Sequence, residues 1–490
     1  MINLILNRLK FLLLIKSLNM KKLLSIMILL LSKELTSISS VMEIRPLSTS
    51  PLYYTMIDYS KKQLFIEALP FYVSMYDTNQ ITHNIMPDGK ATLNFNQQGQ
   101  GDLNPTWMNL ISNNGLANYN SQVTFTPEQY QTGIFLHSYK EYKSFFLDIR
   151  TALVKEATKI AMSEVGGKNG DNPDIMNALQ AFTQSSWNFG KIGELNELVG
   201  FSNFQILIGG TKKIQKQTDS LDLFLAAFAL IEVPSGKGSV SEWLFAPQVG
   251  TNHWGLGFGF ESLMSKDEDI KFMIGGNYRY LLQAWEVRSF DLTDNGPWSR
   301  YLSVQNLYGL PTAPATLGLP GINFFTQPAQ IEGRSQINLF TRTEKQLGKC
   351  AFELSYNFFY TQAETINKIT EIIPGYGIYA LTGPGGGVGG VTTASHATIN
   401  EDVPPLDPVG EFVELSTSMF DKSSGSAKSY LTNTLNFDIQ RVEENYIYGF
   451  GSSIEVAASI GAITSWAIWL KFEYLFANTP HEYDKNGDRL

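Results

Sequence analysis

The side chains best suited to chemistry in this sequence are its five histidines. They are His83, His137, His253, His396 and His481, and no two have the i, i+4 spacing of a helical metal site. His137 falls within a predicted strand and His253 directly precedes one, but neither is accompanied by a serine or carboxylate in a recognisable nucleophile motif. We therefore predict no catalytic residues and no metal site, and keep a hydrolase as the least favoured alternative.

Two further motifs resemble ligand sites incompletely. The glycine-rich segment 381–390 (LTGPGGGVGG) lacks the Lys-Ser/Thr pair and the strand–loop–helix frame of a phosphate-binding loop. Asp484, Asn486 and Asp488 place three oxygen ligands near a glycine, but the distal glutamate of a calcium loop is missing. We predict no cofactor. The net charge of −9 and the pI near 5.3 argue against nucleic acid as a partner.

Charged side chains inside otherwise apolar segments form a third group of candidates. They alternate with large apolar residues, and successive side chains of a strand point to opposite faces. Mixed signs on one face indicate either a charge pattern that tunes ion selectivity or ion pairs that stabilise a wall, and both interpretations stay open. Every second residue of a strand lies on the same face. Counted in this way along each predicted strand, the residues on the face opposite the apolar one include Asp148, Arg150, Glu261, Lys271, Arg279, Arg342, Glu353, Asp438, Glu455, Lys471 and Glu473.

The elements that must hold these charges are short segments of strict alternation. The clearest are three consecutive segments between Tyr430 and Phe476. In the second of them, Tyr446, Tyr448 and Phe450 alternate with small or polar residues. The apolar faces carry aromatic residues near the strand ends, which is typical of a barrel with lipid outside and polar groups inside.

Twelve segments of this kind are predicted strands. The first contains Pro70, and the fifth is apolar on both faces and fits a buried helix equally well. The predicted strands cover residues 62–78, 121–139, 143–158, 203–217, 220–233, 253–264, 269–290, 334–345, 350–364, 428–441, 446–460 and 465–477.

The connections between these strands are sorted by length. Turns of a few residues follow strands 2, 4, 6, 8 and 10, whereas long polar segments follow strands 1, 3, 5, 7 and 9. The one exception is the connection 461–464, which is short where a long one would fit. Within the second long connection, residues 173–183 are predicted to form a short helix. Short turns at one rim and long loops at the other are how outer-membrane barrels thread. The long connections are residues 79–120, 159–202, 234–252, 291–333 and 365–427.

The ends of the chain complete the prediction. A basic start at Met20-Lys21-Lys22, the apolar run 23–31 and small residues before position 41 indicate a cleaved signal peptide, with Met20 as an alternative first residue. The single cysteine, Cys350, excludes an internal disulfide framework, so a closed ladder of backbone hydrogen bonds must stabilise an exported chain. The predicted parts are a signal peptide (1–40), a periplasmic lead-in or small plug (41–61), the barrel (62–477) and a polar tail (478–490).

The signal, the series of hairpins and the sorted loop lengths resemble bacterial outer-membrane barrels of the porin and FadL-like transporter kind. The segment 221–236 (LDLFLAAFALIEVPSG) is similar to strands in that group that end in an apolar-Pro-Ser/Thr-Gly turn. The resemblance covers most of the mature chain. It implies passive passage of solutes through the lumen.

We therefore expect an all-β, single-domain, antiparallel transmembrane barrel of about twelve strands, within a range of about 10–14, in the cell outer membrane. Its predicted partners are the lipid bilayer and small-molecule solutes, and the sequence does not indicate an oligomeric state. The predicted function is a narrow passive pore or small-molecule transporter whose lumen is lined by the charges named above. A structural or adhesive surface barrel that acts through its long loops is the alternative.

Overall fold

In the computed structural model the described residues lie between Arg45 and Pro480. The predicted signal peptide, the segment 381–390, the residues after 480 and His83, His396 and His481 lie outside the described residues. Described are residues 61–78, 91–96, 119–166, 174–193, 195–214, 221–238, 241–266, 269–293, 296–306, 319–379, 412–459 and 462–480, with scattered positions between 45 and 59 and between 82 and 110.

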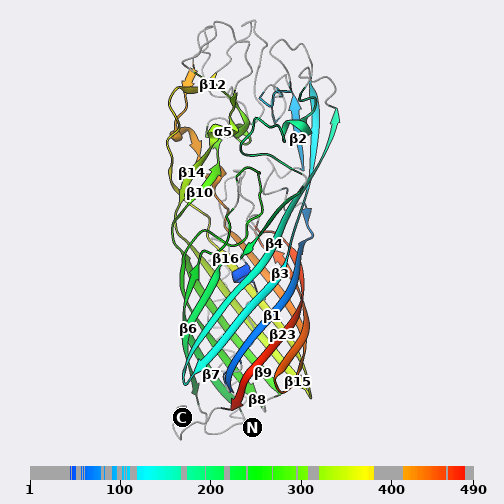
Figure 1. The fold of residues 1–490 in the computed structure, drawn as a ribbon, viewed down its shortest axis with the longest axis vertical. Helices are drawn as coiled ribbons and strands as arrows, with labels where there is room; N and C mark the ends of the chain where they lie inside the picture. Colours follow the sequence, from blue (N-terminus) through cyan, green and yellow to red (C-terminus); the bar gives the residue numbers. More distant parts are fainter. Residues whose placement is uncertain are drawn as a thin grey trace, which may run out of the picture. The chain divides into compact units, whose positions relative to one another are not determined.

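Twelve strands form a closed antiparallel barrel, which confirms the predicted fold class (Figure 1). Around the wall their order is β3-β1-β23-β22-β21-β16-β15-β9-β8-β7-β6-β4, and the pairing of β3 with β4 closes the ring. The strands are β1 (Lys61–Met75), β3 (Asn120–Tyr142), β4 (Phe145–Gly166), β6 (Phe204–Ile214), β7 (Leu221–Val233), β8 (Gly255–Lys266), β9 (Ile270–Leu281), β15 (Arg334–Leu347), β16 (Cys350–Thr361), β21 (Tyr430–Val442), β22 (Tyr446–Ala457) and β23 (Ser465–Pro480).

Strand alternation gives this wall two chemically different faces. On β8, Phe258 and Phe260 are 64% and 53% exposed, whereas Glu261 and Leu263 between the outward positions are buried. The same alternation recurs on β22 and β23, where Phe450 and Leu470 are exposed. Because the large apolar residues of a soluble protein would be buried, this apolar outer face fits contact with lipid.

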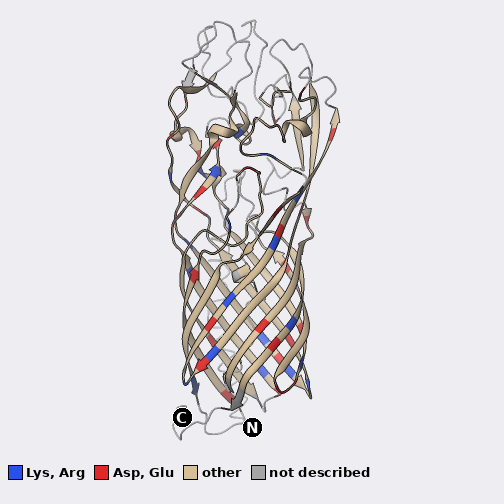
Figure 2. Ribbon diagram, in the orientation of Figure 1, with Lys and Arg blue, Asp and Glu red and all other residues tan. Residues whose placement is uncertain are grey.

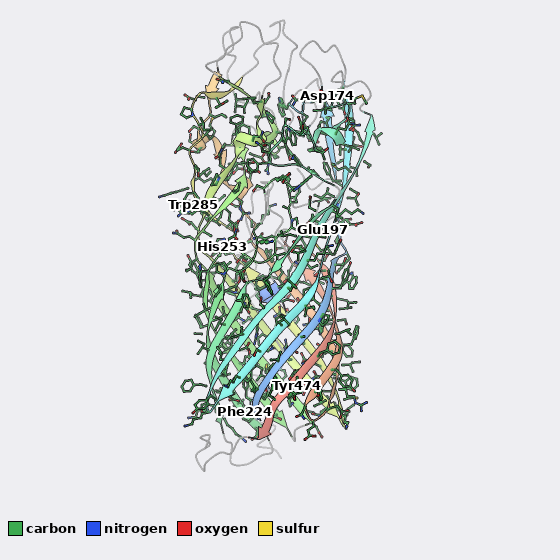
Figure 3. All side chains as sticks on the ribbon, in the orientation of Figure 1. Asp174, Glu197, Phe224, His253, Trp285 and Tyr474 are labelled. Carbon is green, nitrogen blue, oxygen red and sulfur yellow. The ribbon has the colours of Figure 1, made fainter. Side chains whose placement is uncertain are left out.

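Aromatic side chains mark both rims of the outer face. Near the short turns the ring centroids of Tyr446 and Tyr474 are 5.1 Å apart, and near the long connections Tyr72 lies 5.5 Å from Trp466. Figure 3 labels Tyr474 at the first of these rims. Eight residues separate Tyr474 from Trp466 on β23, or about 27 Å along the strand and about 21 Å after a strand tilt of about 40°. That height is close to the roughly 25 Å of an outer-membrane apolar band.

The sorted loop lengths are confirmed as well. Short turns follow β3, β6, β8, β15 and β21, and long connections follow β1, β4, β7, β9 and β16. β1 begins and β23 ends at the short-turn rim, where Lys61 pairs with Pro480. The connection from β22 to β23 is short, as predicted.

Two predicted elements are corrected, and for a third the structure decides between the two alternatives that the sequence left open. The strand predicted at 269–290 ends at Leu281, because the neighbouring strands β8 and β15 also end there and the wall offers no further partner. Residues 221–233 form strand β7 and not a helix; they are apolar on both faces because one faces lipid and the other an apolar part of the lumen. The predicted helix at 173–183 shrinks to α4 (Ala178–Ala181), where the Asn177 side chain accepts a hydrogen bond from the Gln180 amide.

The long connections form small elements and two apolar clusters, the first of which they share with the ends of β3 and β4. Phe182, Trp187 and Tyr301 belong to one cluster, in which the rings of Trp187 and Tyr301 stack at 4.9 Å; Phe290 and Phe420 stack at 5.2 Å in the other. No described helix is long and apolar enough to span a membrane. The elements are η1 (Leu47–Thr49), β2 (Thr92–Asn96), β5 (Asn196–Phe201), β10 (Ala284–Ser289), β11 (Asp291–Leu292), η4 (Ser299–Tyr301), β12 (Ser303–Asn306), β13 (Leu319–Pro320), α5 (Ile322–Phe325), β14 (Thr326–Ile331), β17 (Ile366–Ile369), β18 (Tyr376–Tyr379), β19 (Phe412–Glu414), η6 (Thr417–Met419), β20 (Phe420–Asp421) and η7 (Lys422–Gly425).

The outer face makes a direct prediction about membrane stability. Leu470 lies on β23 between the two aromatic rims, so Leu470→Arg places a cation near the bilayer midplane. We expect the barrel to lose about 2–4 kcal/mol of unfolding free energy in lipid vesicles. The control is Ile373→Arg, at a position 73% exposed in a long connection, and it should leave stability unchanged. Equal unfolding curves for the two variants would contradict a lipid-facing position for Leu470.

Candidate functional site: the lumen of the barrel

All eleven charges singled out in the sequence point to the inner side of the wall. Nine are buried and two, Lys271 and Asp438, are partly buried, while their strand neighbours face outward. Acidic and basic residues are interspersed along the strands (Figure 2). The inner face therefore holds charges of both signs in close proximity.

A network near the short-turn rim centres on His137. Its Nδ1 lies 3.0 Å from Glu67 Oε2, and its Nε2 lies 3.0 Å from Asp148 Oδ1. Arg150 Nε donates to Asp148 Oδ1 at 2.8 Å. Lys471 Nζ lies 3.2 Å from the other oxygen of Glu67, which links strands β1, β3, β4 and β23.

Further polar contacts at this level link other strands of the wall. Arg342 Nη1 lies 3.1 Å from Glu353, and Lys271 Nζ lies 3.0 Å from Glu344. The indole N–H of Trp469 donates to Asp438 at 2.8 Å. A buried charge is tolerated only when it is paired and hydrogen-bonded, so these contacts hold the inner face in one arrangement.

A second network lies near the long connections. Glu232 on β7 pairs with Arg279 on β9, and Asn203 Nδ2 donates to Glu232 at 2.6 Å. Arg288 and Arg334 lie 3.2 and 3.4 Å from Glu364, which also accepts from the Ala427 amide at 2.9 Å. Burial alone raises the pKa of Glu364, but the two guanidinium groups outweigh this effect and lower it to about 2.

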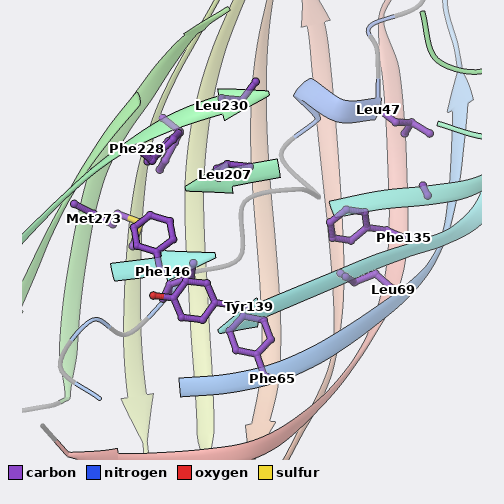
Figure 4. Packing of buried hydrophobic residues seen from close by; sticks show 14 of the residues in the cluster. Leu47, Phe65, Leu69, Phe135, Tyr139, Phe146, Leu207, Phe228, Leu230 and Met273 are labelled. Carbon is purple, nitrogen blue, oxygen red and sulfur yellow. The ribbon is translucent and has the colours of Figure 1, made fainter. Parts of the chain in front are cut away.

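The lumen also contains a large apolar cluster. It draws inward aromatic and aliphatic residues from β1, β3, β4, β6, β7, β8, β9, β15 and β23, including Phe65, Phe135, Phe146, Leu207 and Phe228 (Figure 4). Uncharged polar side chains line β15, β16 and β21. Their buried members are Asn338, Asn357, Ser355, Thr432, Thr434 and Asn436.

Residues from the segment preceding β1 occupy this lumen. Leu47 and Ile57 are buried in the apolar cluster, and Figure 4 shows Leu47 among the wall side chains. The Tyr59 hydroxyl donates to Glu261 on β8. Arg45 Nη1 donates to Glu455 at 2.6 Å and to Thr434 at 3.0 Å. The described residues between 45 and 59 thus contact both the apolar cluster and polar residues of the wall.

Several residues of these networks escaped the sequence analysis. Glu344 shares its parity with Arg342, so a complete count along that strand would have found it, and Glu67 was hidden in a strand weakened by Pro70. Nothing in the local pattern around Arg45 or Tyr59 indicates contact with strands hundreds of residues away. Their role comes only from the closed fold.

Neither described strand-end histidine is arranged for nucleophilic catalysis. Both ring nitrogens of His137 face carboxylates. His253 Nδ1 faces the Leu282 carbonyl, and its Nε2 lies 3.6 Å from Glu286. No described cluster of histidine, cysteine or acidic residues could hold a metal ion. Figure 3 marks His253 near the long-connection end of the wall.

The closed wall, the apolar outer face and the charged interior define the class of protein: an outer-membrane β-barrel. No family model and no curated protein matches the sequence. An outer membrane channel from Pseudomonas putida F1 is similar at a TM-score of 0.37 and 7% identity, over 89% of this chain and 100% of its own.

Two other solved structures are similar at a TM-score of 0.24. OmpT of Vibrio cholerae is 7% identical over 86% of this chain and 100% of its own. A variant of TodX, a monoaromatic hydrocarbon channel, is 6% identical over 87% of this chain and 91% of its own. At these values the likeness supports no functional assignment, and we base ours on the barrel's own side chains.

The buried charge network predicts an asymmetry between two lysines. Lys471→Met removes the cation beside Glu67 and Glu473, so we expect a loss of about 3–5 kcal/mol in the free energy of unfolding. Lys349→Met breaks the exposed pair with Glu443 and should cost less than about 1 kcal/mol. Urea unfolding of both variants in vesicles tests this difference, and equal midpoints would contradict it.

The lowered pKa of Glu364 predicts a pH effect in the acid range. A lowered folded-state pKa means that the stabilisation is complete above the ordinary value of 4.5 and is lost as the pH falls towards about 2. We expect the Tm in detergent to fall between these values, and Glu364→Gln to remove part of the decline. Glu128→Gln, at an exposed ion pair, is the control and should keep the wild-type profile.

Proposed function

We propose that the protein is a narrow passive pore or small-molecule transporter of the outer membrane, closed by the described residues that precede β1, chiefly Arg45, Leu47, Ile57 and Tyr59. One observation carries this proposal. Residues of the same polypeptide that precede β1, and not wall side chains alone, fill part of the lumen. A wall that encloses a peptide segment has a cross-section of at least one polypeptide chain. If that segment leaves, a small solute has room to enter.

The contacts of the segment support a removable closure. Arg45 and Tyr59 hold it through polar contacts with β16, β21, β22 and β8, whereas Leu47 and Ile57 make apolar contacts. No covalent bond joins the described part of it to the wall, apart from the chain that leads into β1. Water or solute can replace each of these contacts, so the closed state is in equilibrium with an open state.

The lining also supports passage of polar solutes. Asparagine, serine and threonine side chains are buried on the inner face of β15, β16 and β21, and bonds such as that from Asn436 Nδ2 to Ser355 Oγ, at 2.9 Å, hold them in place. A barrel filled only for stability would have no need of so many buried polar groups, because each costs free energy unless it is hydrogen-bonded. A solute-facing lining explains them.

Conductance across planar bilayers tests the proposal. Arg45→Gln removes charge-assisted hydrogen bonds worth about 1.5–3 kcal/mol each, so we expect the open probability to rise by about tenfold or more above the wild-type protein. Arg441→Gln removes an exposed arginine of the same wall and should behave as wild type. An Arg45→Gln barrel that folds but carries no current would refute the pore.

A structural or adhesive role is the second candidate, because the long connections contribute to two apolar clusters. Such clusters make the described loops a folded surface rather than a set of independent tethers. Replacing 284–331 by a short turn would separate the two roles. Loss of cell attachment with unchanged conductance would favour adhesion.

A further inference from the structure

Three strands of the wall and Thr49, four residues further along the chain, build the site that Arg45 occupies. Arg45 Nε donates to Thr49 Oγ1 at 3.1 Å, and its Nη2 donates to the Thr49 carbonyl. Its guanidinium group contacts Glu455 Oε2 at 2.6 Å on β22, Thr434 Oγ1 at 3.0 Å on β21 and Asn357 Oδ1 at 2.5 Å on β16. Its central carbon lies 4.7 Å from the ring centroid of Phe359, also on β16. The Arg45 residue is 7% exposed, so these contacts are made away from bulk water.

The wall holds these groups in position through contacts that do not involve Arg45. Thr434 Oγ1 donates to Glu455 Oε2 at 2.8 Å, and Asn357 Nδ2 donates to Asn338 Oδ1 at 2.5 Å. All of these residues are on barrel strands whose backbones are fixed by pairing on both sides. The site is therefore preorganised and would persist after Arg45 leaves.

The chemistry of the site is specific for a planar cation. A guanidinium group presents several N–H donors in one plane and stacks on an aromatic face, whereas an ammonium group is a compact point charge. Glu455 supplies the charge, Thr434 and Asn357 supply acceptors in different directions, and Phe359 supplies the face. Loss of Arg45 would leave the Glu455 carboxylate without its cation at an almost buried position.

We infer that Glu455, Thr434, Asn357 and Phe359 form a guanidinium-binding subsite in the pore wall. Arg45 fills it in the closed state, and a small guanidinium compound takes its place when the segment is displaced. Arg45 thus competes with the solute, and occupation of the site by solute favours the open state. This inference rests on the proposed pore function and names its solute class.

Three probes that share a butyl chain and differ in the head group test the site in the full-length Arg45→Ala barrel. Butylguanidinium should interrupt the ion current at the lowest concentration. Butylammonium, which has the charge but no planar donor set, should need a concentration about tenfold higher, and neutral butylurea should have no effect. In the wild-type barrel, butylguanidinium should raise the open probability because it displaces Arg45.

Two carboxylate variants locate the effect. Adding Glu455→Gln to Arg45→Ala should weaken the block by butylguanidinium at least about tenfold, whereas adding Glu443→Gln, at an exposed turn, should not change it. Conductance with equal block by the guanidinium and ammonium probes, or an unchanged block in Glu455→Gln, would overturn the site and leave the pore intact.

Thermal unfolding separates failure of the site from failure of the pore. If Arg45→Ala carries no current, the pore proposal fails, but a rise in its Tm with butylguanidinium and not with butylurea still supports the site. If the Tm does not rise with butylguanidinium, the proposed site is overturned. If Arg45→Ala does not fold, the response of the wild-type open probability to the same three probes decides the matter.

Discussion

The closed ring of backbone hydrogen bonds is the constraint on which the rest of this structure depends. Lipid offers no partner for an exposed N–H or carbonyl group, so each strand within the membrane must be paired on both sides. The pairing of β1 with β23 joins the first strand of the wall to the last in sequence, and the pairing of β3 with β4 completes the ring. Once the wall is closed, every strand has one face for lipid and one for the lumen, and the alternation of side chains follows from that division.

Closure also decides what the interior must contain. Charged groups that face inward cannot reach bulk solvent freely, and the wall matches Lys471 with Glu67 and Arg342 with Glu353. Apolar residues of many strands form one cluster, and amides and hydroxyls line β15, β16 and β21. Arg45 therefore contacts polar groups and Leu47 contacts apolar ones, although the two residues are close in sequence.

Much of this architecture is predictable from the sequence because period-two alternation is a local signal. It predicts the twelve strands, the sorted connections and the inward position of charges such as Asp148 and Lys471. The end of β9 at Leu281 is set by where its two neighbours stop, which no pattern within residues 269–290 records. The packing of Trp187 on Tyr301 likewise depends on two separate connections meeting.

The binding site of Arg45 has a consequence for the order in which the protein folds. Arg45 and Glu455 are 410 positions apart, and the carboxylate belongs to the second-to-last strand of the wall. Arg45 therefore has no contact with Glu455 until nearly the whole chain has been synthesised. Contacts of such long range form slowly, since the entropy of closing the loop opposes them. Docking of this arginine is thus a late event in maturation, and it can take place only in a molecule whose final hairpin has already assembled.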